Sequence, residues 1–450
     1  MEKYSGLTDG VLLLDNYGED SAMLHQSFRG ASFEGPVIVI EDDGFFPEDV
    51  VSAYQYFCGN FKDSAKTSGK ARYFNEINVP DYWEISGNNS VGKVHDLNHE
   101  RGRIFYAEPK HKRLVRVVDW LDEGGTVRSS DHYNRYGALY ARTFFNKEGK
   151  RFCKAYFDAE GRETILENFV THDIILNRDG KVYVIKNKVD LILKVLEELG
   201  VMKSRLFYNT LSTPLFVSER MPADRKEDVL FWQEGIQNDI PGNMQLILNG
   251  GARRTKTVFA QKKDSYTRLI ELGASKEIVK PLGFVYAYSR QNTFKNEALI
   301  CTNSDRLEKG EELIKALPQM HFHIAALTEM SSKLMSLSQY QNVALYPGAS
   351  TKKIEELFDT CDYYLDINHE SEIVSAVRQA FLHNHLILGW KQTLHNRAFV
   401  APEHVFEEQE SMVTFLRNVM GRKEMINRQI DLQKKAAMSE ETVVYADLLR

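Results

Sequence analysis

Residues 362–390, DYYLDINHESEIVSAVRQAFLHNHLILGW, contain the pattern that decides the fold. The stretch reads as a strand, a polar loop, a helix and a second strand, at residues 362–367, 368–371, 372–383 and 386–389. Ile373, Val377 and Phe381 recur at i, i+4 and i+8, the spacing of one buried stripe on a helix. Strands that alternate with helices predict a parallel sheet covered by helices.

The same alternation occurs in two other parts of the chain. Residues 10–40 predict a strand, a helix and a second strand. After Asn187 the pattern predicts one helix and four strands, at residues 189–199, 206–208, 215–217, 229–232 and 244–248. We therefore expect three α/β or helical parts: a first domain at 1–45 and 187–290, a second domain at 291–406, and a charged helical tail at 407–450 that packs back on the first domain. The polar residues 289–295 are the expected hinge between the two domains.

A different pattern fills residues 46–186. Gly125, Gly137, Gly149 and Gly161 recur every 12 residues between runs rich in aromatic and β-branched side chains. Glycine at short, regular spacing between such runs is typical of successive hairpins. We predict an antiparallel β-meander inserted into the first domain, and thus an α/β protein with two Rossmann-like domains and one added sheet.

Bulk properties exclude several classes of protein. A chain of 450 residues is too long for one core, and a net charge of −6 argues against a nucleic-acid-binding surface. The first residues, MEKYSGLTDG, have no signal-peptide core, and no apolar run approaches membrane-spanning length. The four cysteines are far apart and form no CxxC pair, so we expect reduced thiols and a cytoplasmic protein.

Short motifs along nearly the whole chain resemble those of the GtfB family. They are Leu14–Tyr17, Pro36–Pro47, Tyr82–Ile85, Val118–Asp122, Phe231–Glu234, Pro241–Leu248, Ile324–Ser331, Tyr364–His369, Ile387–Trp390 and Gln392–His395. The resemblance implies a GT-B fold with a β-meander add-on domain. It also implies a stabilising, acceptor-recognising subunit that assembles with a GtfA-type transferase, as a heterotetramer of two plus two. That complex would attach O-GlcNAc to serine-rich repeat adhesins before their export by the accessory Sec system.

Two carboxylates typical of retaining GT-B transferases are missing from the second predicted domain. Retaining glycosyltransferases of the GT-B type have two glutamates separated by seven residues, and Ser371 and Gln379 stand at those positions here. A hydroxyl and an amide cannot replace carboxylates around a developing oxocarbenium charge. We therefore predict a non-catalytic subunit with no cofactor of its own, while its partner uses UDP-GlcNAc. The alternatives are an active retaining UDP-GlcNAc-dependent transferase, with Glu234 as a catalytic carboxylate, and a free-standing peptide-binding chaperone.

Arg306 and Lys309 follow the first strand of the second domain and resemble the cation pair that neutralises a nucleotide-sugar diphosphate. Phosphate binding requires both cations to face the interdomain cleft beside helix N-termini. The favoured alternative is a solvated helix start with Ser304 as N-cap, and thus a vestigial donor cleft. We expect no metal site, because metal-ligand spacing is absent from His369, His383, His385 and His395.

Candidate contacts for a partner or acceptor lie in the predicted meander. Residues 101–116 are rich in arginine and lysine and include Arg113 and Arg116. This segment is either a solvated strand face or a contact with a partner or with the cytoplasmic face of the cell membrane. The aromatic candidates, each also a candidate core residue, are Tyr82, Trp83, Trp120, Tyr133 and Tyr136. Because sheet edges pair readily with peptides or other sheets, we expect the meander to form the interface.

Overall fold

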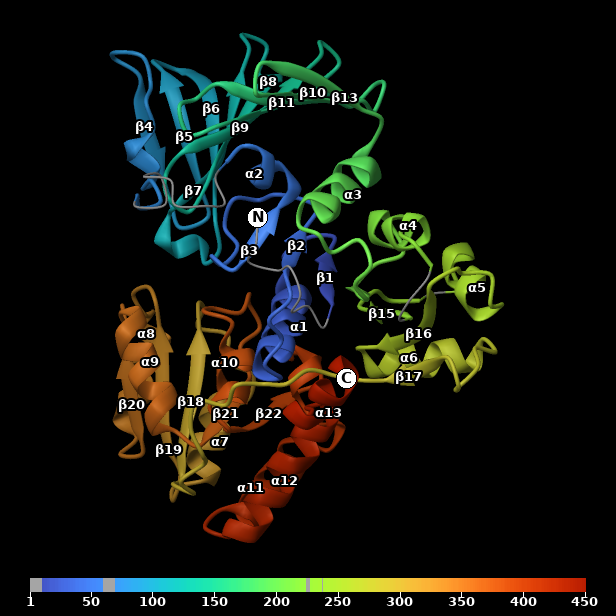
Figure 1. Cartoon of the computed structure of the whole chain (residues 1–450). Coiled ribbons are helices and arrows are strands. Elements are labelled where there is room, and N and C mark those ends of the chain that lie inside the picture. The colour runs from blue at the N-terminus through green and yellow to red at the C-terminus, as the bar shows by residue number, and fades with distance from the viewer. Residues whose placement is uncertain (1–9, 60–68, 224–226, 237) are drawn as a thin grey trace. The chain divides into compact units, whose positions relative to one another are not determined.

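The computed structural model describes residues 10–59, 69–223, 227–236 and 238–450 (Figure 1). The chain forms two compact units, one of Met1–Leu282 with Thr442–Arg450 and one of Gly283–Glu441. Within the described residues, no helix is long and apolar enough to cross a membrane.

A seven-stranded parallel sheet forms the centre of the first unit, in the order β17-β16-β15-β14-β1-β2-β3. Its strands are β1 (Val11–Leu14), β2 (Val37–Val39), β3 (Val50–Ser52), β14 (Leu206–Tyr208), β15 (Asp228–Trp232), β16 (Thr255–Ala260) and β17 (Val279–Pro281). The helices of this part are α1 (Glu19–Gly30), α2 (Ala53–Phe57), α3 (Lys188–Glu198), α4 (Thr213–Arg220), α5 (Gly242–Leu248), α6 (Lys263–Glu271) and α13 (Thr442–Leu449). The central strands are buried apolar runs, as expected of a parallel sheet covered on both faces.

Three predictions for this part of the chain are wrong. The apolar runs 215–217 and 244–248 lie in helices α4 and α5, because periodicity cannot distinguish a short buried strand from a short buried helix. Ser212 caps α4 and Pro214 stands in its first turn, which are helix-start signals. The inserted meander also begins later than residue 46, since β3 pairs with β2 in the parallel sheet.

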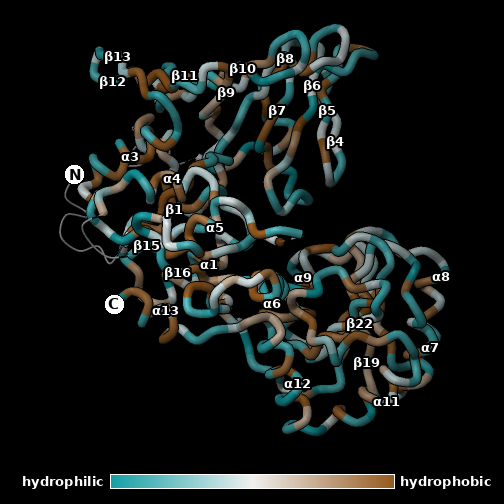
Figure 2. Tube along the Cα trace, turned by 90° about the vertical axis from the view of Figure 1, so that its right-hand side faces the viewer, coloured by the Kyte–Doolittle hydropathy of each residue, from teal (hydrophilic) through white to brown (hydrophobic). Residues whose placement is uncertain are grey.

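Ten consecutive antiparallel strands form the predicted meander, in the order β13 to β4. They are β4 (Glu84–Gly87), β5 (Val91–Asp96), β6 (His99–Tyr106), β7 (Val115–Leu121), β8 (Val127–Tyr133), β9 (Leu139–Phe145), β10 (Arg151–Phe157), β11 (Glu163–Asn168), β12 (Ile174–Arg178) and β13 (Lys181–Ile185). The glycines at 125, 137, 149 and 161 all have φ between 72° and 79° and close hairpin turns, as predicted. Many of these turns are hydrophilic (Figure 2).

The meander and the first parallel sheet share one hydrophobic core. The ring of Tyr54 on α2 stacks on that of Tyr156 on β10, with centroids 4.1 Å apart. The Tyr140 hydroxyl on β9 donates a hydrogen bond of 2.9 Å to the carbonyl of Asp42. The inserted sheet is therefore an integral part of the first unit and not a tethered module.

The second unit contains a six-stranded parallel sheet in the order β20-β19-β18-β21-β22-β23. The strands are β18 (Glu297–Thr302), β19 (His321–Ala326), β20 (Val343–Tyr346), β21 (Tyr363–Asp366), β22 (Leu386–Trp390) and β23 (Val405–Phe406). The helices are α7 (Gly310–Ala316), α8 (Ser332–Met335), α9 (Thr351–Thr360), α10 (Ala376–Leu382), α11 (Gln409–Val419) and α12 (Lys423–Ala436).

The C-terminal tail divides between the two units, which corrects the prediction that it packs on the first domain. Helices α11 and α12 bury Met412, Leu416 and Ile426 in the core of the second unit. Only α13 belongs to the first unit, where the Tyr445 ring contacts those of Phe28 and Phe231 at centroid distances of 5.6 and 6.2 Å. The apolar stripe of each helix decides which sheet it covers.

The predicted hinge at 289–295 is a fixed part of the second unit. Fully buried Asp362 accepts hydrogen bonds from the backbone N–H groups of Thr293 (3.0 Å) and Lys295 (2.7 Å), and it pairs with Arg290. Asn292 donates to the carbonyls of Asp362 and Asn384, at 2.9 Å each. The segment combines exposed polar side chains with a hydrogen-bond network around the buried Asp362 carboxylate.

Candidate functional site

Two loops meet at the carboxyl edge of the second parallel sheet, where α/β proteins usually place their ligand sites. One loop follows β18 and contains Arg306, and the other follows β21 and begins at Asn368. Leu307 and Asn368 form a β-bridge, the Glu308 N–H donates to the Ile367 carbonyl (2.8 Å), and that of His369 donates to the Arg306 carbonyl (3.1 Å). The structure therefore brings the predicted cation loop and the predicted glutamate loop together.

The two positions predicted to be degenerate lie on either side of a tight turn. Ser371 is exposed in the loop, and Gln379 is in the first turn of α10, which begins at Ala376 and not at residue 372. The later start follows from Val374 and Ser375, which both have left-handed backbone conformations, with φ of 49° and 50°. A Glu372 side-chain oxygen accepts a 2.7 Å hydrogen bond from the Val377 N–H. A carboxylate of the chain itself thus occupies the helix N-terminus that an anionic ligand would use.

Both predicted donor cations interact with groups of the chain itself. The Arg306 guanidinium lies 2.8 Å from a Glu370 carboxylate oxygen. The Lys309 ammonium lies 5.0 Å from the centre of a Trp390 ring and donates to the Glu407 carbonyl at 3.3 Å. Ser304 is not a helix cap, because α7 begins at Gly310, directly after Lys309 in a left-handed conformation. The predicted solvated helix start is therefore wrong, and these residues form a loop held by its own ion pair.

A histidine that the sequence reasoning did not use as a site residue completes this loop. One ring nitrogen of His395 lies 2.6 Å from buried Asp366 at the end of β21, and the other lies 2.5 Å from the Glu370 carbonyl. The hydrogen bond to Asp366 raises the pKa of His395 to about 9, so the ring is charged at neutral pH. His395 fixes the loop that bears Glu370, and only its place in the Gln392–His395 motif hinted at this role.

Neutral amides fill the carboxyl edge of the first parallel sheet. Buried Asn209 bonds to Gln233 (3.0 Å), Gln233 bonds to Gln261 (2.8 Å), and Gln261 donates to the Tyr445 hydroxyl at 3.2 Å. This network ties α13 to the sheet. Glu234, the alternative catalytic carboxylate, is exposed beside it, and partial desolvation, followed by the charge of Asp15, raises its pKa.

The candidate contacts in the meander separate into core and surface residues. Trp83, Trp120 and Tyr133 pack with the hydrophobic cluster around β5 to β8, whereas Tyr82 is 97% exposed. Among the arginines, Arg113 donates to the Asn89 side-chain oxygen (2.8 Å), while the Nε atom of Arg116 is buried and has no hydrogen-bond partner within the described residues.

Tyr136 lines an open cavity of about 730 Å³ on the meander. Arg72 and Arg142 supply its cationic side chains, and Arg142 also pairs with buried Asp131 at 2.5 Å. The remaining lining comes from Gly69, Gly137, Ala138, Leu139, Phe157, Ala159, Glu160 and Gly161. A groove with aromatic, aliphatic and guanidinium walls suits an extended polar chain.

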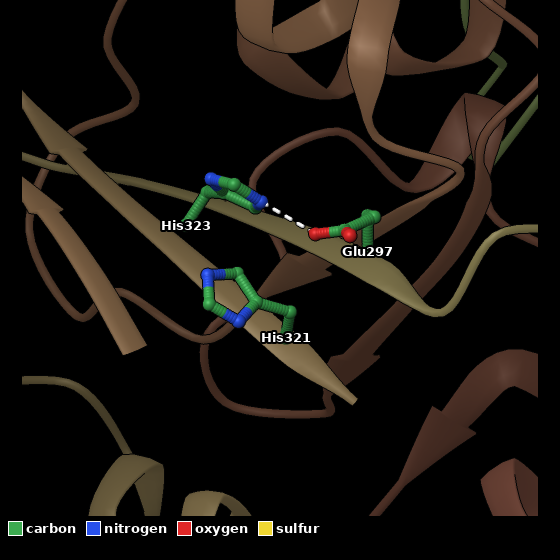
Figure 3. A group of neighbouring side chains, drawn as sticks. All are labelled: Glu297, His321 and His323. Carbon is green, nitrogen blue, oxygen red and sulfur yellow. Dashed lines mark hydrogen bonds and ion pairs between the residues drawn. The ribbon is translucent and has the colours of Figure 1, made fainter. Parts of the chain in front are cut away.

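The structure also assembles a possible cation-binding group that the sequence analysis missed. Potential ligand atoms of Glu297, His321 and His323 all lie within 4.8 Å of one another (Figure 3). The available signal was the H-x-H pattern on a strand, since residues i and i+2 share one face. The cysteines Cys58, Cys153, Cys301 and Cys361 are free, and Cys153 is the one among them that is not fully buried.

Four domain families match the sequence in chain order. They are the GtfB N-terminal domain (residues 11–57), the GtfB middle domain (83–186), the GtfB third domain (188–272) and the GftB/GlyA-F C-terminal domain (298–433). The stabilising protein GtfB of a UDP-N-acetylglucosamine–peptide N-acetylglucosaminyltransferase from Streptococcus pneumoniae is 43% identical, with 89% of each chain covered. Its counterpart from Streptococcus gordonii is 38% identical over 98% of each chain. The chain belongs to the GtfB family.

Solved structures agree with this membership of the GtfB family. A chain of the crystal structure of a GtfA/B complex bound to UDP and GlcNAc has a TM-score of 0.92 and 38% identity, and the match covers 97% of this chain and 98% of that one. TarM has a TM-score of 0.50 at 11% identity over 99% and 98% of the two chains, a likeness of fold alone. The predicted GT-B fold with an inserted antiparallel sheet is confirmed for this GtfB-family chain.

Proposed function

We propose that this chain is the non-catalytic subunit of a protein O-GlcNAc transferase, which stabilises a GtfA-type catalytic partner and recognises the acceptor polypeptide. The relatives carry the name of a stabilising protein for such a transferase, and the similar solved chain comes from a GtfA/B complex. In this proposal UDP-GlcNAc is a ligand of the partner, and the chain needs no cofactor.

The proposal of a non-catalytic subunit rests on the carboxyl edge of the second sheet, where carboxylates of the chain itself bind the groups that a donor would use. Glu370 neutralises Arg306 at 2.8 Å, and Glu372 caps helix α10. A nucleotide diphosphate would have to displace the first carboxylate and would meet the charge of the second. Ser371 and Gln379 supply no carboxylate to stabilise a developing positive charge at the sugar.

The interface half of the proposal rests on the outer edge of the meander. Strand β13 is the last strand of the sheet, and its Val182 and Val184 side chains are 66% and 68% exposed. An exposed apolar edge strand is a template for pairing with another sheet. We therefore place the docking site of the transferase at β13, with two copies of each subunit in the complex.

We assign acceptor recognition to the cavity beside Tyr136. A serine-rich chain has little charge, so its capture depends on backbone hydrogen bonds and aromatic contacts. Arg72 and Arg142 offer donors to peptide carbonyls, and Tyr136 offers a ring. Adhesins with serine-rich repeats, glycosylated in the cytoplasm before accessory Sec export, are the acceptors in this proposal, with the complex in peripheral contact with the cell membrane.

Co-expression with a GtfA-type transferase tests the proposal. Size-exclusion chromatography should show one complex, and transfer of GlcNAc from UDP-GlcNAc to a serine-rich peptide should require both chains. Turnover by the isolated chain that disappears in a Glu234→Gln variant would establish the active-transferase alternative. Tight binding of the peptide without any complex with the transferase would instead establish the chaperone alternative.

A further inference from the structure

We propose that the second unit binds a transition-metal ion of the zinc class through Glu297, His321 and His323. These residues lie at the amino edge of the parallel sheet, because Glu297 begins β18 and His321 begins β19. The candidate donor loops lie at the opposite, carboxyl edge. The metal site is therefore independent of the proposed transferase role and serves the stability of the unit.

Strand register brings the three side chains to one face. Glu297 and His321 are direct partners in the parallel ladder, and the His321 N–H donates to the Asn296 carbonyl at 2.8 Å. His323 stands two residues further along β19, so its ring projects from the same face as that of His321. The two imidazole rings have centroids 4.9 Å apart.

One ligand is already oriented toward the site. The Nε2 atom of His323 lies 2.6 Å from a Glu297 carboxylate oxygen (Figure 3). Its Nδ1 atom is 2.9 Å from the Tyr346 hydroxyl on β20. A histidine ligand is typically held in this way, with one nitrogen at the metal and the other bonded to an outer group that fixes the ring.

The remaining ligands have room to close around an ion. His321 and Glu297 are both partly exposed, and the ring nitrogens of His321 have no hydrogen-bond partner within the described part of the chain. A tetrahedral zinc ion with bonds of about 2.0–2.2 Å places its ligand atoms roughly 3.3 Å apart. Small side-chain rotations from the present arrangement, with all ligand atoms within 4.8 Å, meet this requirement.

The ligand set selects the class of ion. Two imidazoles with one carboxylate suit Zn²⁺ and its neighbours Co²⁺ and Ni²⁺, whereas Mg²⁺ and Ca²⁺ prefer oxygen ligands alone. Three protein ligands leave the fourth position for water. The Lys353 ammonium lies 5.2 Å from the Tyr346 ring centre and 3.3 Å from a Glu356 carboxylate oxygen, which offsets its charge.

The test uses the full chain with an affinity tag that contains no histidine. Equilibrium dialysis and calorimetry with Zn²⁺, and visible absorption with Co²⁺, should show one bound equivalent that excess Mg²⁺ does not displace. His321→Ala should weaken binding at least 10-fold, and Tyr346→Phe, which removes the outer partner of His323, by about 10-fold. His99→Ala, a change of an exposed histidine on the meander, should leave the affinity unchanged.

A second readout measures folding instead of binding. Zn²⁺ should raise the thermal midpoint of the second unit in the parent chain and in His99→Ala, and not in His321→Ala. If His321→Ala does not fold, His321→Asn replaces it in both the binding and the thermal measurements. The proposal is wrong if no equivalent of Zn²⁺ or Co²⁺ binds, or if His321→Ala binds the ion as tightly as the parent.

Discussion

The exposed valines of β13 offer a quantitative test of where the transferase docks. The change is Val182→Thr together with Val184→Thr, which keeps side-chain shape and β-branching but replaces a methyl group with a hydroxyl on each residue. Full burial of a valine contributes about 1.5–3 kcal/mol, and roughly two-thirds of each side chain is exposed in the free chain. The pair can therefore contribute about 2–4 kcal/mol to docking, and its loss should weaken binding roughly 30- to 700-fold.

Binding of the purified double variant to an immobilised GtfA-type transferase measures this effect. Val443→Thr on α13 is the matched control, since Val443 is 54% exposed and lies outside the meander. Because all three valines are exposed, each variant alone should unfold within about 0.5 kcal/mol of the parent in urea. Parent-like affinity of the double variant, or equal weakening by Val443→Thr, would refute the assignment of β13.

Three further predictions concern the second unit. Asp362→Asn should destabilise it by about 3–5 kcal/mol, because Arg290 stays buried without its partner. Burial opposes ionisation of Asp362, but its hydrogen bonds and Arg290 hold its pKa below the ordinary value of about 3.9. The stability that Asp362 contributes is thus complete above that value and is lost as the pH falls through its folded-state pKa. The urea midpoint of the parent should therefore fall with pH in this range, and that of the variant should not. Calorimetry with UDP-GlcNAc should give a Kd above about 1 mM for the parent and for Arg306→Ala alike; micromolar affinity that Arg306→Ala removes would show a retained ligand site. Ser375→Gly should raise stability by about 0.5–1 kcal/mol because φ is 50° there, whereas the control Ser336→Gly, at a φ of −62°, should lower it; a loss of stability in Ser375→Gly would contradict the strained turn.

Other candidate contacts of the meander, outside β13 and the cavity beside Tyr136, differ in how cleanly a substitution tests them. Arg113 is held by Asn89 at the surface, so its charge can be reversed with little effect on folding. The Nε atom of Arg116 is buried, and reversal there would disturb the sheet itself. Disruption of the Lys147–Lys150 hairpin is the cleaner test, because a Cβ added at Gly149 would come no closer than 3.9 Å to a neighbouring residue. Loss of transferase or acceptor binding in such a variant, with the second unit still folded, is the expected result.

Local patterns in the sequence determined much of the architecture. The 12-residue glycine spacing predicts the hairpins because a tight turn requires positive φ at a defined position. Val377 and Phe381 of the predicted stripe lie in helix α10, whereas Ile373 precedes its start. Ser371 and Gln379 predict the loss of carboxylates from residue identity alone. The run Leu215–Val217 is helical and not the predicted strand, because three apolar residues are too few to show the period that separates helix from strand.

Only the tertiary structure decided which distant residues meet. The pairing of Arg306 with Glu370, and of His395 with Asp366, depends on strand order and loop path, which no local pattern encodes. The same holds for Glu297 and His321, which are 24 positions apart in sequence and adjacent in the ladder. Secondary structure follows from interactions over a few residues, whereas an ion pair or a ligand set requires the whole sheet to be in register. The sequence by itself therefore predicts the loss of the donor carboxylates, and the folded sheet shows which side chains pair with Arg306 and meet the start of α10.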